Sequence, residues 1–190
     1  MLLINIECDK LQQLLGDDKI KIVSIKNIQD DFFVAVSDNG DMLYFYFKNG
    51  VTAFHNYEDK PAIRLNNGTK IFMENNKIHR ENDQPAVIFE NNFEMYFRHG
   101  KDHRENDKPA IIVQWCSNFP SFFKVNYSAF DNEDNAGYSI WLNNDKIHRL
   151  HKPAFVHNIL NGSDRYFIMD TEFSEYDFKK ACLKHIVEDF

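Results

Sequence analysis

Short apolar runs alternate with polar turns along most of the chain, and one polar phrase returns at a fixed interval. Lys77–Ala86 and Lys101–Ala110 lie 24 residues apart and read KIHRENDQPA and KDHRENDKPA. A third copy, Lys146–Ala154, is one residue shorter between its histidine and its proline. A weaker copy, His55–Ala62, begins 24 residues upstream of His79. A fixed period of this length indicates a repeat architecture.

Each copy of the phrase lies between two apolar runs of strand length. The run before the phrase is aromatic and ends in a turn, as in Ile71–Met73, Met95–Phe97 and Tyr138–Leu142 with the turns Asn75-Asn76, His99-Gly100 and Asn143-Asn144-Asp145. The run after it starts at a Pro-Ala pair, as in Ala62–Leu65, Ala86–Phe89, Ala110–Val113 and Ala154–Val156, and the turns Asn66-Asn67-Gly68 and Asn91-Asn92 follow two of these runs. Two strands of ~5–6 residues and two turns fill such a period. Because proline cannot donate to a sheet, we expect Pro61, Pro85, Pro109 and Pro153 at strand starts or bulges.

The N-terminal segment, residues 1–54, predicts a short helix and an antiparallel meander. Asp9–Leu15 places three leucines on one helical face before a glycine. Lys19–Lys26 partly alternates, Phe32–Val36 is a second strand, and Met42–Phe47 is the return strand. Asn39-Gly40 predicts a tight hairpin in which both residues have positive φ.

The C-terminal segment, residues 171–190, predicts a helix. Ser174 suits the N-cap position, with Asp177 three residues on in a variant of the capping box. Phe173 and Phe178 occupy the two positions of a hydrophobic staple. Apolar residues then recur every four positions at Phe178, Cys182, Ile186 and Phe190, with Leu183 and Val187 beside them. We expect this helix to cover the bare end of the sheet; alternatively, its apolar face docks on a second protein.

The repeat period is interrupted once, by 21 extra residues between Trp115 and Tyr138. The inserted segment, residues 116–137, is either a long loop or an additional hairpin. Insertions in repeat proteins often lie on the working face, which makes its aromatic residues a candidate contact with a partner. These residues are Phe119, Phe122, Phe123 and Tyr127. The alternative is that they pack back onto a widened core.

These patterns predict a mainly β protein. We expect stacked antiparallel β-hairpin repeats in a single meandering sheet, closed by a C-terminal capping helix. The whole chain, 1–190, is expected to be one domain, with an N-terminal helix and β-meander cap (1–54), repeats (55–170) and the terminal helix (171–190).

Composition excludes several classes of function. The net charge is −7 without a block of like charge, which argues against non-specific binding to nucleic acid or an acidic membrane. No apolar run approaches a membrane span, and the N-terminus lacks the basic flank of a signal peptide. The three cysteines, Cys8, Cys116 and Cys182, share no metal spacing, so we expect free thiols in a reducing cytoplasm. The frequent use of Asn, Ile, Lys and Phe is typical of AT-rich genomes such as those of many viruses and phages.

The recurring aromatic strand, Asn/Gly turn and Lys-x-His-Arg-Glu-x-Asp-x-Pro-Ala phrase resembles the divergent MORN-type repeats of large DNA viruses, phages and some bacteria. The resemblance covers roughly residues 43–170. The chain departs from that pattern before each proline, where the family often has Gly, and it lacks the Tyr-x-Gly strands of ordinary MORN repeats. The resemblance implies a stacked β-hairpin sheet with a binding role, and it carries over no catalytic residue.

The polar residues of the phrase are of the types found in metal and catalytic sites, but their expected spacing argues against such a site. They are His79, Arg80, Glu81, His103, Arg104, Glu105, His148 and Arg149. Equivalent positions in successive hairpins lie roughly 9–10 Å apart, whereas metal–nitrogen bonds are ~2.0–2.1 Å, so no single ion bridges the histidines. We expect each histidine to bond to a nearby carbonyl or carboxylate, and each arginine to pair with a Glu or Asp of its own or the adjacent repeat. In the third copy Leu150 stands in place of the glutamate. A catalytic acid would not be replaced in this way, so the substitution favours a structural role for the glutamates. His99, His151, His157 and His185 have no spacing that suggests a site.

The sequence therefore favours a non-enzymatic interaction module without metal or cofactor. Its partner is expected to be a protein, contacted through the flat sheet face or the insertion; in a virus or phage, a host factor in the host cytoplasm is the expected target. One alternative is a protein that sequesters an anionic nucleotide through exposed arginines. The least favoured alternative is a hydrolase that uses one His/Asp/Glu set in a single repeat. The chain is expected to be a monomer or a homodimer.

Overall fold

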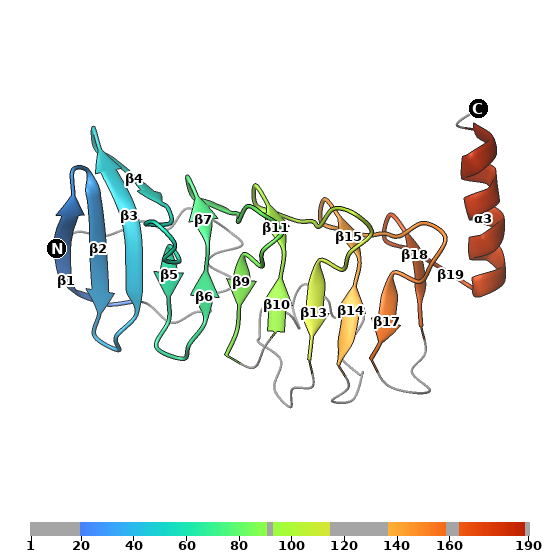
Figure 1. Ribbon diagram of the computed structural model, residues 1–190, viewed down its shortest axis with the longest axis horizontal. Coiled ribbons are helices and arrows are strands. Elements are labelled where there is room, and N and C mark those ends of the chain that lie inside the picture. Colours follow the sequence, from blue (N-terminus) through green and yellow to red (C-terminus); the bar gives the residue numbers. More distant parts are fainter. Residues whose placement is uncertain (1–19, 91–92, 115–136, 159–163, 189–190) are drawn as a thin grey trace.

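The computed structural model describes residues 20–90, 93–114, 137–158 and 164–188. The expected helix at residues 9–15, the turn at residues 91–92 and the insertion with Phe119, Phe122, Phe123 and Tyr127 lie outside the described residues. Within the described part, eleven strands form one antiparallel sheet. Four further hairpins form a row beyond the ends of the main strands, at the top of the view in Figure 1, and we call this row the second layer. The mainly β architecture of hairpin strands in a single meandering sheet, with a C-terminal helix, is confirmed.

The N-terminal meander contains the long strands of the sheet. They are β1 (Ile22–Gln29), β2 (Phe32–Ser37), β3 (Met42–Lys48) and β4 (Val51–Phe54). β2 lies between β1 and β3, and β4 pairs with β3 beside the main path of the sheet.

The predicted turn geometry between β2 and β3 is wrong. Only Gly40 has a positive φ, of 94°, and Asn39 does not. The N–H of Gly40 donates to the carbonyl of Ser37, and the N–H of Ser37 donates to the carbonyl of Asp41, so the loop is one residue longer than a two-residue hairpin. The Asn39 side chain accepts a hydrogen bond from the N–H of Asp41 instead.

The repeat region continues the sheet with very short strands. They are β5 (Ile63–Arg64), β6 (Lys70–Ile71), β9 (Val87–Ile88), β10 (Phe93–Met95), β13 (Ile111–Val113), β14 (Tyr138–Ile140) and β17 (Phe155–His157). The second layer consists of hairpins β7 (Met73–Glu74) with β8 (Lys77–Ile78), β11 (Phe97–Arg98) with β12 (Lys101–Asp102), β15 (Leu142–Asn143) with β16 (Lys146–Ile147), and β18 (Tyr166–Ile168) with β19 (Thr171–Phe173). The prolines lie two residues before strands β5, β9, β13 and β17, which confirms their expected place at strand starts.

Each predicted aromatic strand is broken in two at its central aromatic residue. Phe72 lies between β6 and β7, Tyr96 between β10 and β11, and Trp141 between β14 and β15. The N–H of each aromatic residue donates to the carbonyl of the alanine in the following Pro-Ala pair, at 2.7–2.8 Å. Its carbonyl accepts the N–H of the next histidine, at 3.0–3.1 Å. The chain thus passes from the main sheet into the second layer at this residue.

The core lies along one face of the short strands. The alanines of the four Pro-Ala pairs, together with Ile63, Val87, Ile111 and Phe155 after them, have no exposed area. Cross-strand partners such as Ile71 and Val87, or Met95 and Ile111, belong to the same buried cluster. Three of these alanines, Ala86, Ala110 and Ala154, also accept at their carbonyls the N–H of the aromatic residue that breaks the strand.

The second-layer hairpins close with two residues of positive φ, the geometry of a type I′ turn. These pairs are Asn75/Asn76, His99/Gly100, Asn144/Asp145 and Met169/Asp170. The second residue of each pair donates its N–H to the preceding hairpin, namely to the carbonyls of Phe54, Ile78, Asp102 and Ile147. In three of the four turns a side chain returns the bond, since Asn76, Asp145 and Asp170 accept the N–H of Phe54, Asp102 and Ile147 at 2.7–2.8 Å.

Helix α3 (Glu175–Glu188) follows the last hairpin at the end of the molecule opposite β1 (Figure 1). The N–H of Asp177 donates to Ser174 Oγ at 3.2 Å, which confirms the predicted N-cap. α3 contacts β18 and β19, and Phe178 packs on Tyr166 with 4.9 Å between ring centroids. Cys182 is buried as expected, whereas Leu183 is 64% exposed and lies outside the packed face. The helix therefore covers the last second-layer hairpin.

Candidate functional site

The repeated phrases form a row of polar loops along one side of the second layer. We call His55–Ala62, His79–Ala86, His103–Ala110 and His148–Ala154 loops 1 to 4. The positive φ values of Asn82 and Asp83 in loop 2, and of Asn106 and Asp107 in loop 3, turn the chain back toward its proline. Asn and Asp tolerate this left-handed backbone better than other non-glycine residues, which explains their place in the phrase.

The arginine of each later loop lies flat on the aromatic residue that breaks the strand. The guanidinium carbon is 3.6 Å from the ring centroid of Phe72 for Arg80, 3.6 Å from that of Tyr96 for Arg104, and 3.8 Å from that of Trp141 for Arg149. Each guanidinium also donates to the carbonyl of its own loop's proline, at 3.2–3.3 Å. Cation–π contact and hydrogen bonding together fix the arginine in place.

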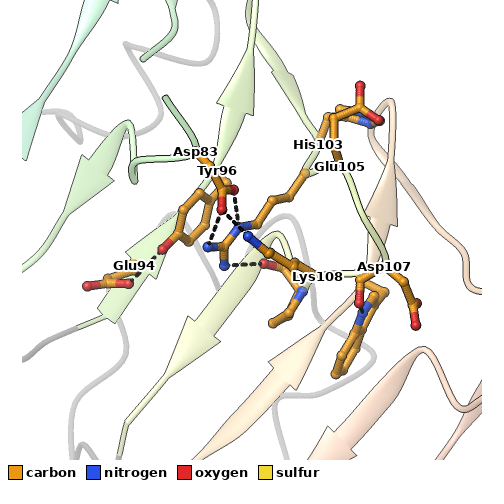
Figure 2. A network of polar contacts seen from close by, with 10 residues as sticks. Asp83, Glu94, Tyr96, His103, Glu105, Asp107 and Lys108 are labelled. Carbon is orange, nitrogen blue, oxygen red and sulfur yellow. Dashed lines mark hydrogen bonds and ion pairs between the residues drawn. The ribbon is translucent and has the colours of Figure 1, made fainter. Parts of the chain in front are cut away.

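Each arginine of loops 3 and 4 also binds the aspartate of the preceding loop. Arg104 donates to both carboxylate oxygens of Asp83, at 2.6 and 3.2 Å, and Lys108 binds the same carboxylate (Figure 2). Arg149 and Lys152 hold Asp107 in the same manner, with Arg149 at 2.6 and 3.0 Å. We call this arrangement the aspartate clamp. The expected pairing of arginines with carboxylates of the adjacent repeat is present in both cases.

The clamps change the acidity of their aspartates. Hydrogen bonds from Arg104 and then Lys108 lower the pKa of Asp83 to about 2. The hydrogen bond from Arg149 lowers the pKa of Asp107. Burial raises the pKa of Tyr96, whose hydroxyl donates to Glu94 at 3.1 Å, to about 12. These groups are held in one charge state over the physiological range.

The junction between loops 1 and 2 is weaker. Arg80 interacts with Asp59 only through longer-range attraction. Burial lowers the pKa of Arg80, and the attraction to Asp59 partly opposes this effect. The position of Lys108 and Lys152 is occupied by Gln84, which cannot bind a carboxylate as a cation.

The histidines connect consecutive repeats through the backbone. His55, His79 and His148 each accept at Nδ1 the N–H of the first turn residue of the next hairpin, namely Asn75, His99 and Met169, at 3.3 Å. On the other ring nitrogen, Nε2 of His79 lies 2.8 Å from Glu81, and Nε2 of His103 lies 3.1 Å from Glu105. The hydrogen bonds from these histidines lower the pKa of Glu81 and of Glu105. The histidines therefore bond to a carboxylate, as expected. Their second partner is a backbone N–H and not the expected carbonyl.

Among the described residues, one group of potential metal ligands comes together that the sequence did not indicate. Glu74, His79 and His99 each place a ligand atom within 4.8 Å of the others, and the two imidazole rings stack with 4.2 Å between centroids. His99 occupies a turn position that is Asn75 or Asn144 in the neighbouring hairpins. Its contact with His79 depends on how this turn aligns with the preceding loop, which the sequence does not reveal.

The hydrogen bonds of His79 do not suit a metal. Because its Nδ1 accepts the N–H of His99, the neutral ring carries its proton on Nε2, which points at Glu81. A protonated nitrogen has no free lone pair for an ion, and histidines that bind metals normally donate from their other nitrogen. We therefore assign these residues to the contacts between repeats.

Two hollows separate the loops. One, of about 310 Å³, lies between loops 2 and 3 against Tyr96 and Arg98. The other, of about 610 Å³, lies between loops 3 and 4 against Trp141 and includes the exposed Leu150. The side chains of Arg104 and Arg149 in their walls are only 13% and 11% exposed, because the clamps and aromatic rings cover them.

The structure brings most of the predicted ladder residues into this row. His79, Arg80 and Glu81 are contiguous with His103, Arg104 and Glu105 around the first hollow, and the latter three meet His148 and Arg149 around the second. The predicted partner-binding residues Phe119, Phe122, Phe123 and Tyr127 fall outside the described residues.

Comparison with known proteins gives no relative: no family model, curated protein or solved structure matches the chain. Within the described residues, no helix combines the length and apolar character needed to cross a membrane.

Proposed function

We propose that the chain is a non-enzymatic interaction module that binds a protein partner. The observation that supports this most is that the ladder residues are already bonded to one another. The arginines of loops 3 and 4 are each bound by a ring, a backbone carbonyl and a carboxylate, and Arg80 of loop 2 by a ring and a carbonyl. In an enzyme, we would expect one repeat to hold a catalytic side chain whose surroundings differ from those of its counterparts in the other repeats. A row of similar loops instead suits an extended binding surface.

The same contacts argue against nucleotide sequestration. That function needs arginines free to form charge-assisted bonds with phosphate. A nucleotide at Arg104 or Arg149 would have to displace the bidentate aspartate of the clamp. We therefore rank the nucleotide-binding alternative below protein binding.

The resemblance to MORN-type repeats of viruses and phages belongs to the same proposal. A chain of that origin would act in the cytoplasm of its host, and blocking a host factor is the use we propose for it. The candidate contact surfaces remain the insertion with Phe119, Phe122, Phe123 and Tyr127, or the flat face of the sheet.

The test is affinity capture from host lysate, followed by reconstitution with the purified partner. Wild type is compared with a triple variant, Phe119→Ser, Phe122→Ser and Phe123→Ser, and with Tyr176→Ser as a control, because Tyr176 is 78% exposed on α3. A reconstituted complex that the triple variant loses and the control keeps would support the module and its site. A complex that both variants keep would place the interface elsewhere. Capture of nucleotide with no protein partner would refute the proposal.

A further inference from the structure

Loop 1 departs from the later loops at the arginine position. Asn56 follows its histidine where Arg80, Arg104 and Arg149 follow theirs. The Asn56 side chain accepts the N–H of Met73 at 2.8 Å, so it serves the backbone rather than a ring.

An aromatic wall stands beside Asn56. The ring of Tyr57 lies parallel to that of Tyr44, with 6.3 Å between centroids. Phe32 contacts both Tyr46 and Tyr57, with centroid separations of 4.1 and 5.0 Å. Phe32, Tyr46, Tyr57 and Asn56 line a hollow of about 500 Å³, and Tyr46 is 38% exposed at its mouth. At loop 1, the wall of the hollow is thus formed by aromatic rings and not by a guanidinium group.

The charged groups around this hollow are mostly acidic. Asp30, Asp31 and Glu58 line it, and Lys48 is the one cation among the lining residues. Lys48 pairs with Asp31 at 3.1 Å, but both side chains are largely exposed, at 72% and 47%. Exposed pairs of this kind are weak, so the ammonium of Lys48 is readily replaced. The hollow therefore combines aromatic faces with a net negative charge.

Aromatic faces attract cations, and alkylated ammonium groups are bound by such walls in many proteins. This chain uses the same contact internally: Lys60 lies 5.2 Å from the centroid of Tyr57, and three arginines cover the rings of the later repeats. We propose that the hollow lined by Phe32, Tyr46, Tyr57, Asp30, Asp31 and Glu58 binds an alkylammonium cation. This site goes beyond the proposed protein-binding function and does not depend on it. The cation has two sources with one chemistry, a methylated lysine side chain and a choline-type small molecule or headgroup.

The first experiment is an NMR titration of the ¹⁵N-labelled full chain with choline and with 3,3-dimethyl-1-butanol, its neutral isostere. Choline should shift the backbone signals of residues around the hollow, with affinity about tenfold above that of the alcohol. Equal affinity of the two probes, or no shift with choline, would overturn the proposal. The amide of trimethyllysine serves as a third probe: tighter binding than choline assigns the cation to a protein side chain, and weaker binding assigns it to a small molecule. Either result supports the site.

Matched variants test the wall and the charge separately. Tyr46→Leu removes a ring of the wall and should weaken choline binding about tenfold, whereas Phe47→Leu removes an equally exposed ring outside the hollow and should leave binding unchanged. Asp30→Asn keeps a residue that tolerates the φ of 46° at this turn and removes one charge, so it should weaken binding a few-fold in a folded chain. Lys48→Met removes the competing ammonium and should tighten binding. Choline binding that neither Tyr46→Leu nor Asp30→Asn reduces would refute the site.

Discussion

The N-terminal meander and the repeat region build one sheet by different means. β1, β2 and β3 are six to eight residues long, so each neighbouring pair forms a long ladder of backbone hydrogen bonds. The strands of the repeats are two or three residues long. Some backbone hydrogen bonds continue beyond these strands, as from the N–H of Ala86 to the carbonyl of Met95, and side chains add further contacts between the repeats. The aspartate clamps and the turn residues that bond to the preceding hairpin are these side-chain contacts.

The junctions between loops extend this comparison within the repeat region. The junctions at Asp83 and Asp107 have a complete clamp of arginine and lysine. The junction at Asp59 has Arg80 at longer range and Gln84 in place of the lysine. If side chains hold the short strands together, equivalent substitutions should differ in cost between these junctions.

The largest effect is expected from Arg104→Met. The change removes the ring contact, the bond to the Pro109 carbonyl and the bidentate contact with Asp83, and should lower the free energy of unfolding by about 2–3 kcal/mol. Arg80→Met should cost about 1 kcal/mol less, because its junction lacks the clamp. Urea denaturation of both variants gives the difference.

Arg98→Met is the control for this pair, since Arg98 binds Glu105 in an ion pair that is more than half exposed. It should cost no more than about 0.5 kcal/mol. Equal losses at Arg80 and Arg104 would contradict the importance of the clamp.

Gly100→Asn should stabilise the protein. Gly100 lacks the side-chain oxygen with which Asn76, Asp145 and Asp170 accept a backbone N–H of the preceding hairpin. Its φ of 88° is near the 65° of Asn76, and an added Cβ would approach Lys77 at an ordinary 3.8 Å. A new acceptor for the N–H of Ile78 should add about 1 kcal/mol, measured as a higher urea midpoint at unchanged slope. Gly100→Ala, which adds the Cβ without the oxygen, is the control and should destabilise.

Acid should weaken the complete clamps. The pKa of Asp83 is lowered to about 2 by Arg104 and Lys108, below the value of about 3.9 in an unfolded chain. Such a carboxylate stabilises the fold above the unfolded pKa and loses its contribution as pH falls through the folded pKa. We expect a loss of stability between about pH 4 and pH 2, below about 1 kcal/mol for Asp83 because this partly exposed pair is screened. Urea denaturation over that range should show a flatter profile for Asp83→Asn, and an unchanged profile would refute this assignment.

The smallest effect is expected from Gln84→Lys, which supplies the missing cation at the first junction. An exposed ion pair with Asp59 should add about 0.3–0.5 kcal/mol. The reverse change, Lys108→Gln, should remove a similar amount from the junction at Asp83. Thermal unfolding of both variants measures the two effects, and Lys180→Gln at an exposed position of α3 is the control. A loss in Gln84→Lys would show that loop 2 does not place this residue near Asp59.

Much of the fold was accessible from the sequence because the repeat fixes it several times over. The strand starts after the prolines, three of the second-layer turns and the Ser174 cap follow from local residue preferences and were predicted. The fourth turn, at Met169 and Asp170, was not, because it has no Asn or Gly. The break at Phe72, Tyr96 and Trp141 was not, because these residues and their neighbours on both sides are apolar or small, and such a run resembles one continuous strand. The residues beneath Arg80, Arg104 and Arg149 were therefore expected to be ordinary strand positions.

The site was less accessible than the fold. The sequence predicted that arginines pair with carboxylates, but Glu and Asp were equivalent candidates until the positive φ of Asp83 and Asp107 placed them against the next loop. The stack of His79 on His99 depends on register between a loop and the following turn, which no single repeat contains. The hollow at Tyr46 and Tyr57 joins residues from β2, β3 and loop 1, so its members share no spacing at all.

The aspartate clamp has a direction: each loop offers a carboxylate forward and reaches backward with its cations. Loop 4 has His151 in place of that carboxylate, and Ser174, eight residues after Tyr166, begins the helix where another arginine would stand. Phe178 then covers the ring of Tyr166 that a guanidinium would have covered. The row of clamps thus ends at loop 4, because neither a carboxylate nor a further arginine continues it. Arrays with more repeats should be obtainable by inserting further copies of residues 77–100, with loop 4 and α3 kept as the terminator.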